Sequence, residues 1–110
     1  MHKLEKQLID KGIIDSDLTS FLISDWYSNI KISFVGNEDG KLVTCSFDDC
    51  FEIDFKHDLS YSKGKTTNGT NDFKYFIQDI KISEQDGNFH CFISAWPFQG
   101  KIICKSISIE

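Results

Sequence analysis

Four cysteines are the side chains best suited to chemistry in this chain of 110 residues, because a thiolate can bind a metal or attack an electrophile. They are Cys45, Cys50, Cys91 and Cys104. Structural zinc sites use close cysteine pairs on tight turns, and the chain has no Cys-x-x-Cys pair. We therefore expect no metal, no cofactor and four reduced thiols that pack as small hydrophobic side chains. A Cys45–Cys50 disulfide is the alternative in an oxidising compartment.

The other motifs of catalytic type are incomplete. Gly64-Lys65-Thr66 resembles the end of a phosphate-binding loop, but Leu59 stands where the first glycine of that loop belongs. His57 and Asp58 are adjacent, and adjacent strand residues point to opposite faces, so they do not form a base with its orienting carboxylate. No serine lies in a Gly-x-Ser-x-Gly turn. The sequence therefore predicts no catalytic residue and a protein that is not an enzyme.

Charge is the strongest functional signal in the sequence. The chain has 17 acidic residues, 12 lysines and no arginine, a net charge of −5. Segment 38–58 holds seven acids against two lysines and so carries the whole excess, while the rest of the chain is balanced. A nucleic-acid-binding protein usually has the opposite sign, so we expect no direct binding of DNA or RNA. The seven acids are Glu38, Asp39, Asp48, Asp49, Glu52, Asp54 and Asp58.

The elements that position these side chains follow from periodicity, within one domain that spans residues 1–110. Residues 1–25 are expected to be helical. Leu4, Leu8 and Ile9 fit one helix that stops at Gly12, and a second helix, capped by Asp15 or Ser16, would carry a stripe of Leu18, Phe21 and Leu22. Residues 26–110 are expected to be rich in strands, because the chain has 15 isoleucines and 10 phenylalanines but one alanine.

Alternation of apolar and polar residues indicates strands at 30–34, 42–47, 51–55, 89–95 and 103–109. Turns are expected at 36–40 and at Asp86-Gly87, a break at 97–100, and a long loop at 62–72. Residues 73–83 fit a helix or a strand, and we favour a strand for their later portion. The predicted fold is α+β, with two short N-terminal helices followed by a mostly antiparallel sheet of five to six strands.

Two aromatic clusters, Trp26-Tyr27 and Trp96-Pro97-Phe98, have two interpretations. Each is either a core element at the end of a strand or, beside an acidic patch, a set of exposed binding hot spots. The acidic segment is likewise either a surface that steers a basic partner or a solvated sheet face that keeps the protein soluble. Both alternatives stay open on the sequence.

The order of these features resembles a known group of proteins. Asp25-Trp26 precedes Ile30-Lys31-Ile32-Ser33 and a turn with glycine and aspartate, two alternating strands follow, and Phe76–Ile82 and Phe98–Ile109 complete the pattern. This layout, over residues 25–110, resembles the small cytoplasmic immunity proteins of bacterial polymorphic toxin systems, including those of contact-dependent growth inhibition. The resemblance implies a protein that binds one cognate toxin domain tightly and blocks it, and such toxins are often basic nucleases.

The hypothesis for the site joins that resemblance to the charge pattern. The seven acids of segment 38–58 would bind the toxin, with Tyr61 or Trp26 as an anchor. The charged start of the chain, 1–7, and the lack of a long apolar run predict a cytoplasmic protein without a membrane span. We expect the protein to be a monomer or a weak dimer. Alternatives are a small ligand-binding or enzymatic α+β domain with a pocket between helices and sheet, or a structural module that dimerises through a sheet edge.

Overall fold

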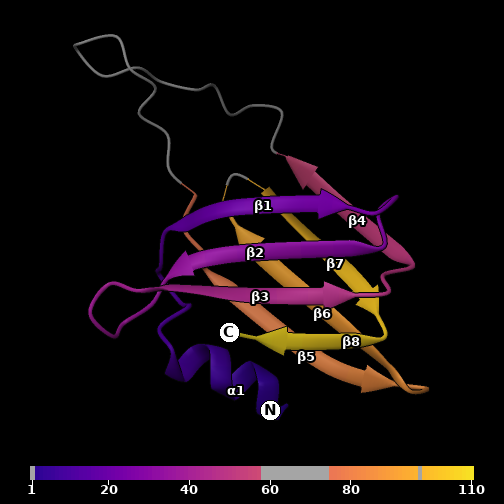
Figure 1. Cartoon of the computed structure of the whole chain (residues 1–110), viewed down its shortest axis with the longest axis horizontal. Coiled ribbons are helices and arrows are strands. Elements are labelled where there is room, and N and C mark those ends of the chain that lie inside the picture. Colours follow the sequence, from indigo (N-terminus) through magenta and orange to yellow (C-terminus); the bar gives the residue numbers. More distant parts are fainter. Residues whose placement is uncertain (1, 58–74, 97) are drawn as a thin grey trace, which may run out of the picture.

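Two antiparallel sheets of four strands each pack face to face, with one short helix at an edge (Figure 1). The computed structural model describes residues 2–57, 75–96 and 98–110, and the elements below are those of the described residues. They are α1 (Lys3–Asp10), β1 (Leu18–Ser24), β2 (Asn29–Val35), β3 (Leu42–Asp48), β4 (Glu52–His57), β5 (Asp79–Gln85), β6 (Asn88–Ala95), β7 (Phe98–Cys104) and β8 (Ser106–Ile109). The fold is therefore mostly antiparallel β, with less helix and more strands than the sequence predicted.

The strand order is β1-β2-β3-β8 in the first sheet and β4-β7-β6-β5 in the second. Neighbouring strands are hydrogen-bonded, so β1 and β4 lie at edges of their sheets. Isoleucines from both sheets fill the space between the layers, which explains their excess in the composition. The buried apolar residues are Leu8, Ile13, Ile30, Ile32, Phe34, Val43, Cys45, Phe47, Ile77, Ile80, Ile82, Cys91, Ile93, Ala95, Ile102 and Cys104.

The predicted second helix is wrong, because residues 18–24 form strand β1. The pairing of β1 with β2 shifts register between Leu18 and Ser20, which is the mark of a β-bulge. Because of the extra residue, Leu18 lies beside buried Phe34 and Phe21 lies beside buried Ile32, although their spacing of three would put them on opposite faces of a regular strand. The bulge thus produces the three-residue spacing that imitates a helix.

The single strand predicted at 103–109 is also wrong. The chain forms β7 and β8 instead, which belong to different sheets and meet at Lys105. Ile102 and Cys104 are buried in β7, whereas Ile107 is packed against the core from β8, so the inward side changes from even to odd positions across the corner. The predicted break at 97–100 is partly wrong, because β7 begins at Phe98 and Gly100 lies inside it.

Several local predictions are confirmed. Helix α1 ends at Asp10, and Gly12 has the positive φ of +88° that suits glycine after a helix. Asp86 and Gly87, both with positive φ, join β5 to β6 as a two-residue hairpin. The turn at 36–40 joins β2 to β3, and β5 supplies the strand expected in the later portion of 73–83. The predicted loop at 62–72 lies outside the described residues.

Helix α1 lies beside β5, at an edge of the second sheet (Figure 1). The Glu5 carboxylate accepts a hydrogen bond from the backbone N–H of Ile82 in β5, with 2.7 Å between the two atoms. His2 caps the helix by accepting from Leu4 N–H through Nδ1, and its Nε2 is 2.6 Å from a carboxylate oxygen of Glu84. Helix α1 thus provides a hydrogen-bond acceptor for a backbone group of the edge strand β5. Unpaired backbone groups at a sheet edge can otherwise pair with another chain.

Candidate functional site

The structure distributes the predicted acidic residues over three places. Glu38 and Asp39 lie in the β2–β3 turn, Asp48 and Asp49 lie at the other end of β3, and Glu52 and Asp54 lie on β4. Asp58 and Tyr61 fall outside the described residues. The described acids of segment 38–58 therefore do not share one surface. The charges beside each group of acids decide whether that part of the surface is negative.

The acids on β4 stand among lysines. Glu52 and Asp54 are exposed and alternate with the half-buried Ile53, so both lie on the outer face of the second sheet. Lys101 of β7 pairs with Asp54 in the strand register, and its Nζ is 3.1 Å from a carboxylate oxygen of Glu52. An exposed ion pair of this kind adds little stability, but it neutralises the charge that a partner would meet.

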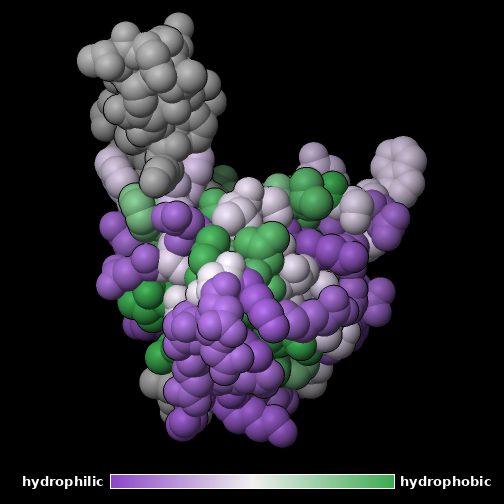
Figure 2. Space-filling model, turned by 60° about the vertical axis from the view of Figure 1, so that its left-hand side comes forward, coloured by the Kyte–Doolittle hydropathy of each residue, from purple (hydrophilic) through white to green (hydrophobic). Residues whose placement is uncertain are grey.

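The β2–β3 turn also has lysines among its acids. Lys11 and Lys41 line the same shallow hollow as Glu38 and Glu110, and the backbone N–H of Asn37 bonds to the carbonyl oxygen of Lys11. In Figure 2, where this end of the molecule has come forward, hydrophilic side chains gather on the surface. Lysine and carboxylate side chains are mixed there, which is typical of a solvated end.

The end of the first sheet opposite that turn carries an acidic cluster. Strand register aligns Ser24, Asn29, Asp48 and Ser106 in one row across the four strands. The residues that border this row are Asp25, Ser28, Asp49 and Lys105. Three of these eight residues are acids and one is a lysine. Asp25 directly follows β1 and Asp48 ends β3, so the strand register brings these acids to the same end of the sheet.

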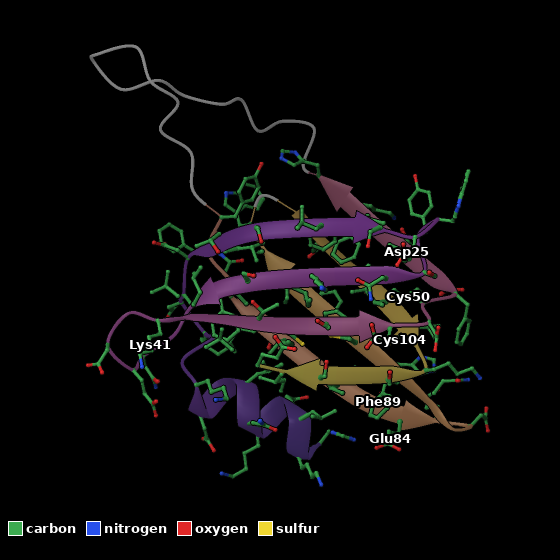
Figure 3. All side chains as sticks on the ribbon, in the orientation of Figure 1. Asp25, Lys41, Cys50, Glu84, Phe89 and Cys104 are labelled. Atoms are coloured by element: carbon green, nitrogen blue, oxygen red, sulfur yellow. The ribbon has the colours of Figure 1, made fainter. Side chains whose placement is uncertain are left out.

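Hydrogen bonds join the loops at this end. The backbone N–H of Cys50 donates to the carbonyl oxygen of Ser28, 2.8 Å away, and the Asn29 side-chain amide donates to the Asp48 carboxylate. Asp25, Cys50 and Cys104 mark this end in Figure 3, while Lys41 marks the opposite one. The β1–β2 turn and the β3–β4 connection thus form one continuous surface.

Exposed aromatic side chains complete the surface. The side chain of Trp26 is 99% exposed and that of Tyr27 is 67% exposed, so the structure rules out the core interpretation for this cluster. Phe51 is 57% exposed, and the Lys105 ammonium lies 5.5 Å from the centre of its ring. We use the name Trp26 surface for Asp25, Trp26, Tyr27, Asp48, Asp49 and Phe51.

The β1–β2 turn holds its aromatic residues in an unusual backbone conformation. The N–H of Ser28 bonds to the carbonyl oxygen of Asp25 at 3.1 Å, which closes a turn with Trp26 and Tyr27 at its centre. Asp25, Trp26 and Tyr27 have φ values of 53°, 58° and 70°. Two-residue turns of this sign normally use asparagine and glycine, because a side chain on Cβ crowds the backbone there.

Two residues of the Trp26 surface, Asp25 and Phe51, are not among the site residues that the sequence predicts, whereas Tyr27 belongs to an aromatic cluster for which the sequence offers exposed binding hot spots as one interpretation. Asp25 lies outside the acidic segment in sequence and joins it only through the strand register. Phe51 fits the apolar face of the strand predicted at 51–55, so the alternation gives no sign of its exposure. The bulge in β1 hides the hairpin turn after it, because it makes the preceding strand look helical.

The cysteines are not arranged for reaction. All four are free, and Cys45, Cys91 and Cys104 are buried in the core, as the sequence predicted, while Cys50 is half-buried. Burial raises the pKa of the Cys45 and Cys104 thiols to about 12 and raises that of Cys91 well above its usual value. A neutral thiol is a weak nucleophile and a poor metal ligand.

An open groove of about 440 Å³ lies between the edges of β1 and β4. Its walls are mostly apolar, with Phe21 of β1 in edge-to-face contact with Phe55 of β4, and His57 and Tyr75 at one end. His57 and Tyr75 are also the last and first described residues on either side of 58–74. Within the described residues, no group of three or more His, Cys, Asp and Glu side chains could hold a metal ion. Nor does the described chain contain a helix long and apolar enough to span a membrane.

Comparison with known proteins agrees with a role in binding. The sequence matches, over residues 1–110, the family described as Immunity protein PIM7. The chain belongs to this immunity protein family, which confirms the resemblance to immunity proteins of toxin systems. Membership supports a protein that binds and neutralises a cognate toxin.

The fold is also found among solved structures. One of them is the crystal structure of an uncharacterized protein from Neisseria gonorrhoeae, which superposes with a TM-score of 0.61. The match covers 88% of this chain and 91% of that chain, at 16% sequence identity. At that identity the likeness concerns the fold alone. No curated protein matches the sequence.

Proposed function

We propose that this protein binds a cognate nuclease toxin in the cytoplasm and covers the cationic active-site cleft of that toxin with the Trp26 surface. A nuclease must attract phosphates, so its cleft is positively charged. Carboxylates that occupy the cleft take the place of those phosphates and exclude the substrate. Inhibition of this kind requires no catalytic group from the immunity protein.

The observation that carries the proposal is the local charge at the end of the first sheet. The acids on β4 and in the β2–β3 turn have lysines beside them. Asp25, Asp48 and Asp49 lie at the end of the first sheet that carries the exposed aromatic turn, and Lys105 is the single lysine of their row and its borders. Charged rims set the rate and the partner choice of association, and aromatic residues supply contact area. The Trp26 surface has both components.

Co-expression with the toxin encoded immediately upstream tests the function as a whole. The protein should protect cells from that toxin, co-purify with it, and inhibit it in competition with added nucleic acid. A pair that neither protects cells nor co-purifies would exclude the proposed function.

A matched pair of charge reversals tests the surface. Asp49 and Asp39 are both exposed aspartates with φ near +50°, at opposite ends of β3, so lysine imposes the same backbone cost at each. Asp49→Lys should slow association with the toxin by roughly tenfold at low salt and less at high salt. Asp39→Lys should leave the rate near that of the wild type. Equal effects of the two variants would reject the Trp26 surface as the acidic contact.

A further inference from the structure

Trp26 presents a large apolar side chain in a place where the free protein gains nothing from it. The indole is 99% exposed, although a buried tryptophan would remove about 150–250 Å² of surface from water. A partner that buries the indole would gain the free energy that the free protein does not. Tryptophan is among the residues most enriched at binding hot spots.

The backbone beneath Trp26 supports the same conclusion. Three consecutive residues other than glycine, Asp25 to Tyr27, adopt left-handed conformations, in which Cβ crowds the backbone, most of all for large side chains such as tryptophan and tyrosine. Strain of this kind persists only where the surrounding structure holds it, and it concentrates at functional sites. The sequence keeps a tryptophan and a tyrosine at positions where asparagine or glycine would relieve the strain.

The turn is also held in place before any partner arrives. The carbonyl oxygen of Asp25 accepts hydrogen bonds from both the N–H and the side-chain hydroxyl of Ser28, the latter at 2.6 Å. The carbonyl oxygen of Ser28 in turn accepts from the N–H of Cys50 in the next connection. A side chain presented on a fixed turn loses little conformational entropy on binding, which raises affinity.

The neighbours of Trp26 define the kind of pocket that it fits. Asp25 precedes it in the turn, Asp49 follows β3 at the same end of the first sheet, and the exposed ring of Phe51 adds apolar area there. An exposed indole at an acidic end of the sheet complements an apolar recess bordered by lysine or arginine, whose cations can also contact the ring face.

From these observations we infer that Trp26 is the anchor of the interface and inserts into an apolar recess of the toxin with a cationic border. The inference rests on the proposed function, since it names the contact through which the toxin is held. Trp26 then supplies most of the affinity, and the carboxylates speed the approach of the toxin and orient it.

The test measures the affinity of the purified upstream-encoded toxin domain for four proteins by titration calorimetry, with a thermal melt of each. They are the wild type, Trp26→Ala, Trp26→Gly and Leu42→Ala. Leu42 is a matched control, because its side chain is 61% exposed and lies at the opposite end of β3. Both Trp26 variants should bind at least about thirty-fold more weakly, and Leu42→Ala within about twofold of the wild type.

The melts separate loss of contact from loss of fold. Trp26→Gly should melt no lower than the wild type, because glycine tolerates the positive φ that tryptophan does not. If the wild type binds the toxin and both Trp26 variants bind it with near-normal affinity, Trp26 is not the anchor, and the proposed function is unaffected. A wild type that fails to bind would overturn both.

Discussion

The backbone N–H of Cys50 lies 2.8 Å from the carbonyl oxygen of Ser28, and this hydrogen bond ties the β3–β4 connection to the β1–β2 turn. Residues 22 positions apart in sequence thereby build one end of the sandwich. The bond fixes the strained turn against the connection that follows β3, next to Asp48 and Asp49. The geometry of the Trp26 surface is thus part of the fold and does not wait for a partner.

Relief of strain in that turn should stabilise the free protein. Tyr27 has a φ of 70° and is 67% exposed, so Tyr27→Gly should raise the free energy of unfolding by about 0.5–1 kcal/mol, as release of left-handed strain exceeds the extra entropy of glycine in the unfolded chain. Urea unfolding measures this. Tyr27→Ala removes the same ring but retains the strain, and an equal gain from alanine would show that the turn is not strained.

Gly100 should be intolerant of any side chain. A Cβ there would lie 2.2 Å from the carbonyl oxygen of Asp54 and 2.6 Å from the Cα of Phe55, and both are backbone atoms of the paired strand β4. Gly100→Ala should lower the free energy of unfolding by about 1–3 kcal/mol or more. Gly40→Ala is the control, with open space around its Cβ among the described residues and only the cost of a positive φ. A smaller loss at Gly100 than at Gly40 would contradict the close approach of β4 and β7.

Glu5 should protect the edge of the second sheet. Glu5→Ala leaves the N–H of Ile82 without its carboxylate acceptor, which should cost about 1–2 kcal/mol and speed hydrogen exchange at that amide. The control is Lys6→Ala, which removes an exposed pair with Asp10 on the same helix and should cost under about 0.5 kcal/mol. Unchanged exchange at Ile82 in Glu5→Ala would show that α1 does not cover β5.

The fold should lose stability at alkaline pH through its buried thiols. The pKa of Cys45 is raised from 9.0 to about 12 by burial, so a folded-state pKa lies above the unfolded one. The stabilisation is therefore complete below pH 9 and is lost as pH rises toward 12. In Cys45→Val, the free energy of unfolding should fall less between about pH 9 and pH 11 than it does in the wild type. The two proteins share all other titrating groups, so the difference between their curves reports Cys45. Parallel curves would contradict a role for this thiol.

The sequence predicts much of the fold because period-two alternation is a local property. It identifies β2, β3 and β4 within a residue or two, and Asp86-Gly87 specifies its hairpin through turn chemistry alone. It fails at two irregularities, the bulge after Leu18 and the corner at Lys105, since each breaks the alternation on which the prediction depends. Leu18 and Phe21 both pack against the core from either side of the bulge, and the corner passes the chain from one sheet to the other.

The candidate site is less accessible from sequence. Net charge by segment drew attention to Asp48 and Asp49, but it could not show that Glu52 has Lys101 beside it or that Asp25 joins the cluster. Those relations depend on strand register. Trp26 was a candidate anchor in the sequence, whereas its exposure follows from a turn conformation that turn statistics would not assign to a tryptophan.

Hydrogen exchange of the free protein and of its complex with the purified toxin domain tests the central claim most directly. Binding through the Trp26 surface should slow exchange at the amides of 25–29 and 48–51 and leave those of 37–41 unchanged. Protection confined to 37–41, or to the outer face of the second sheet around Lys101, would contradict the claim.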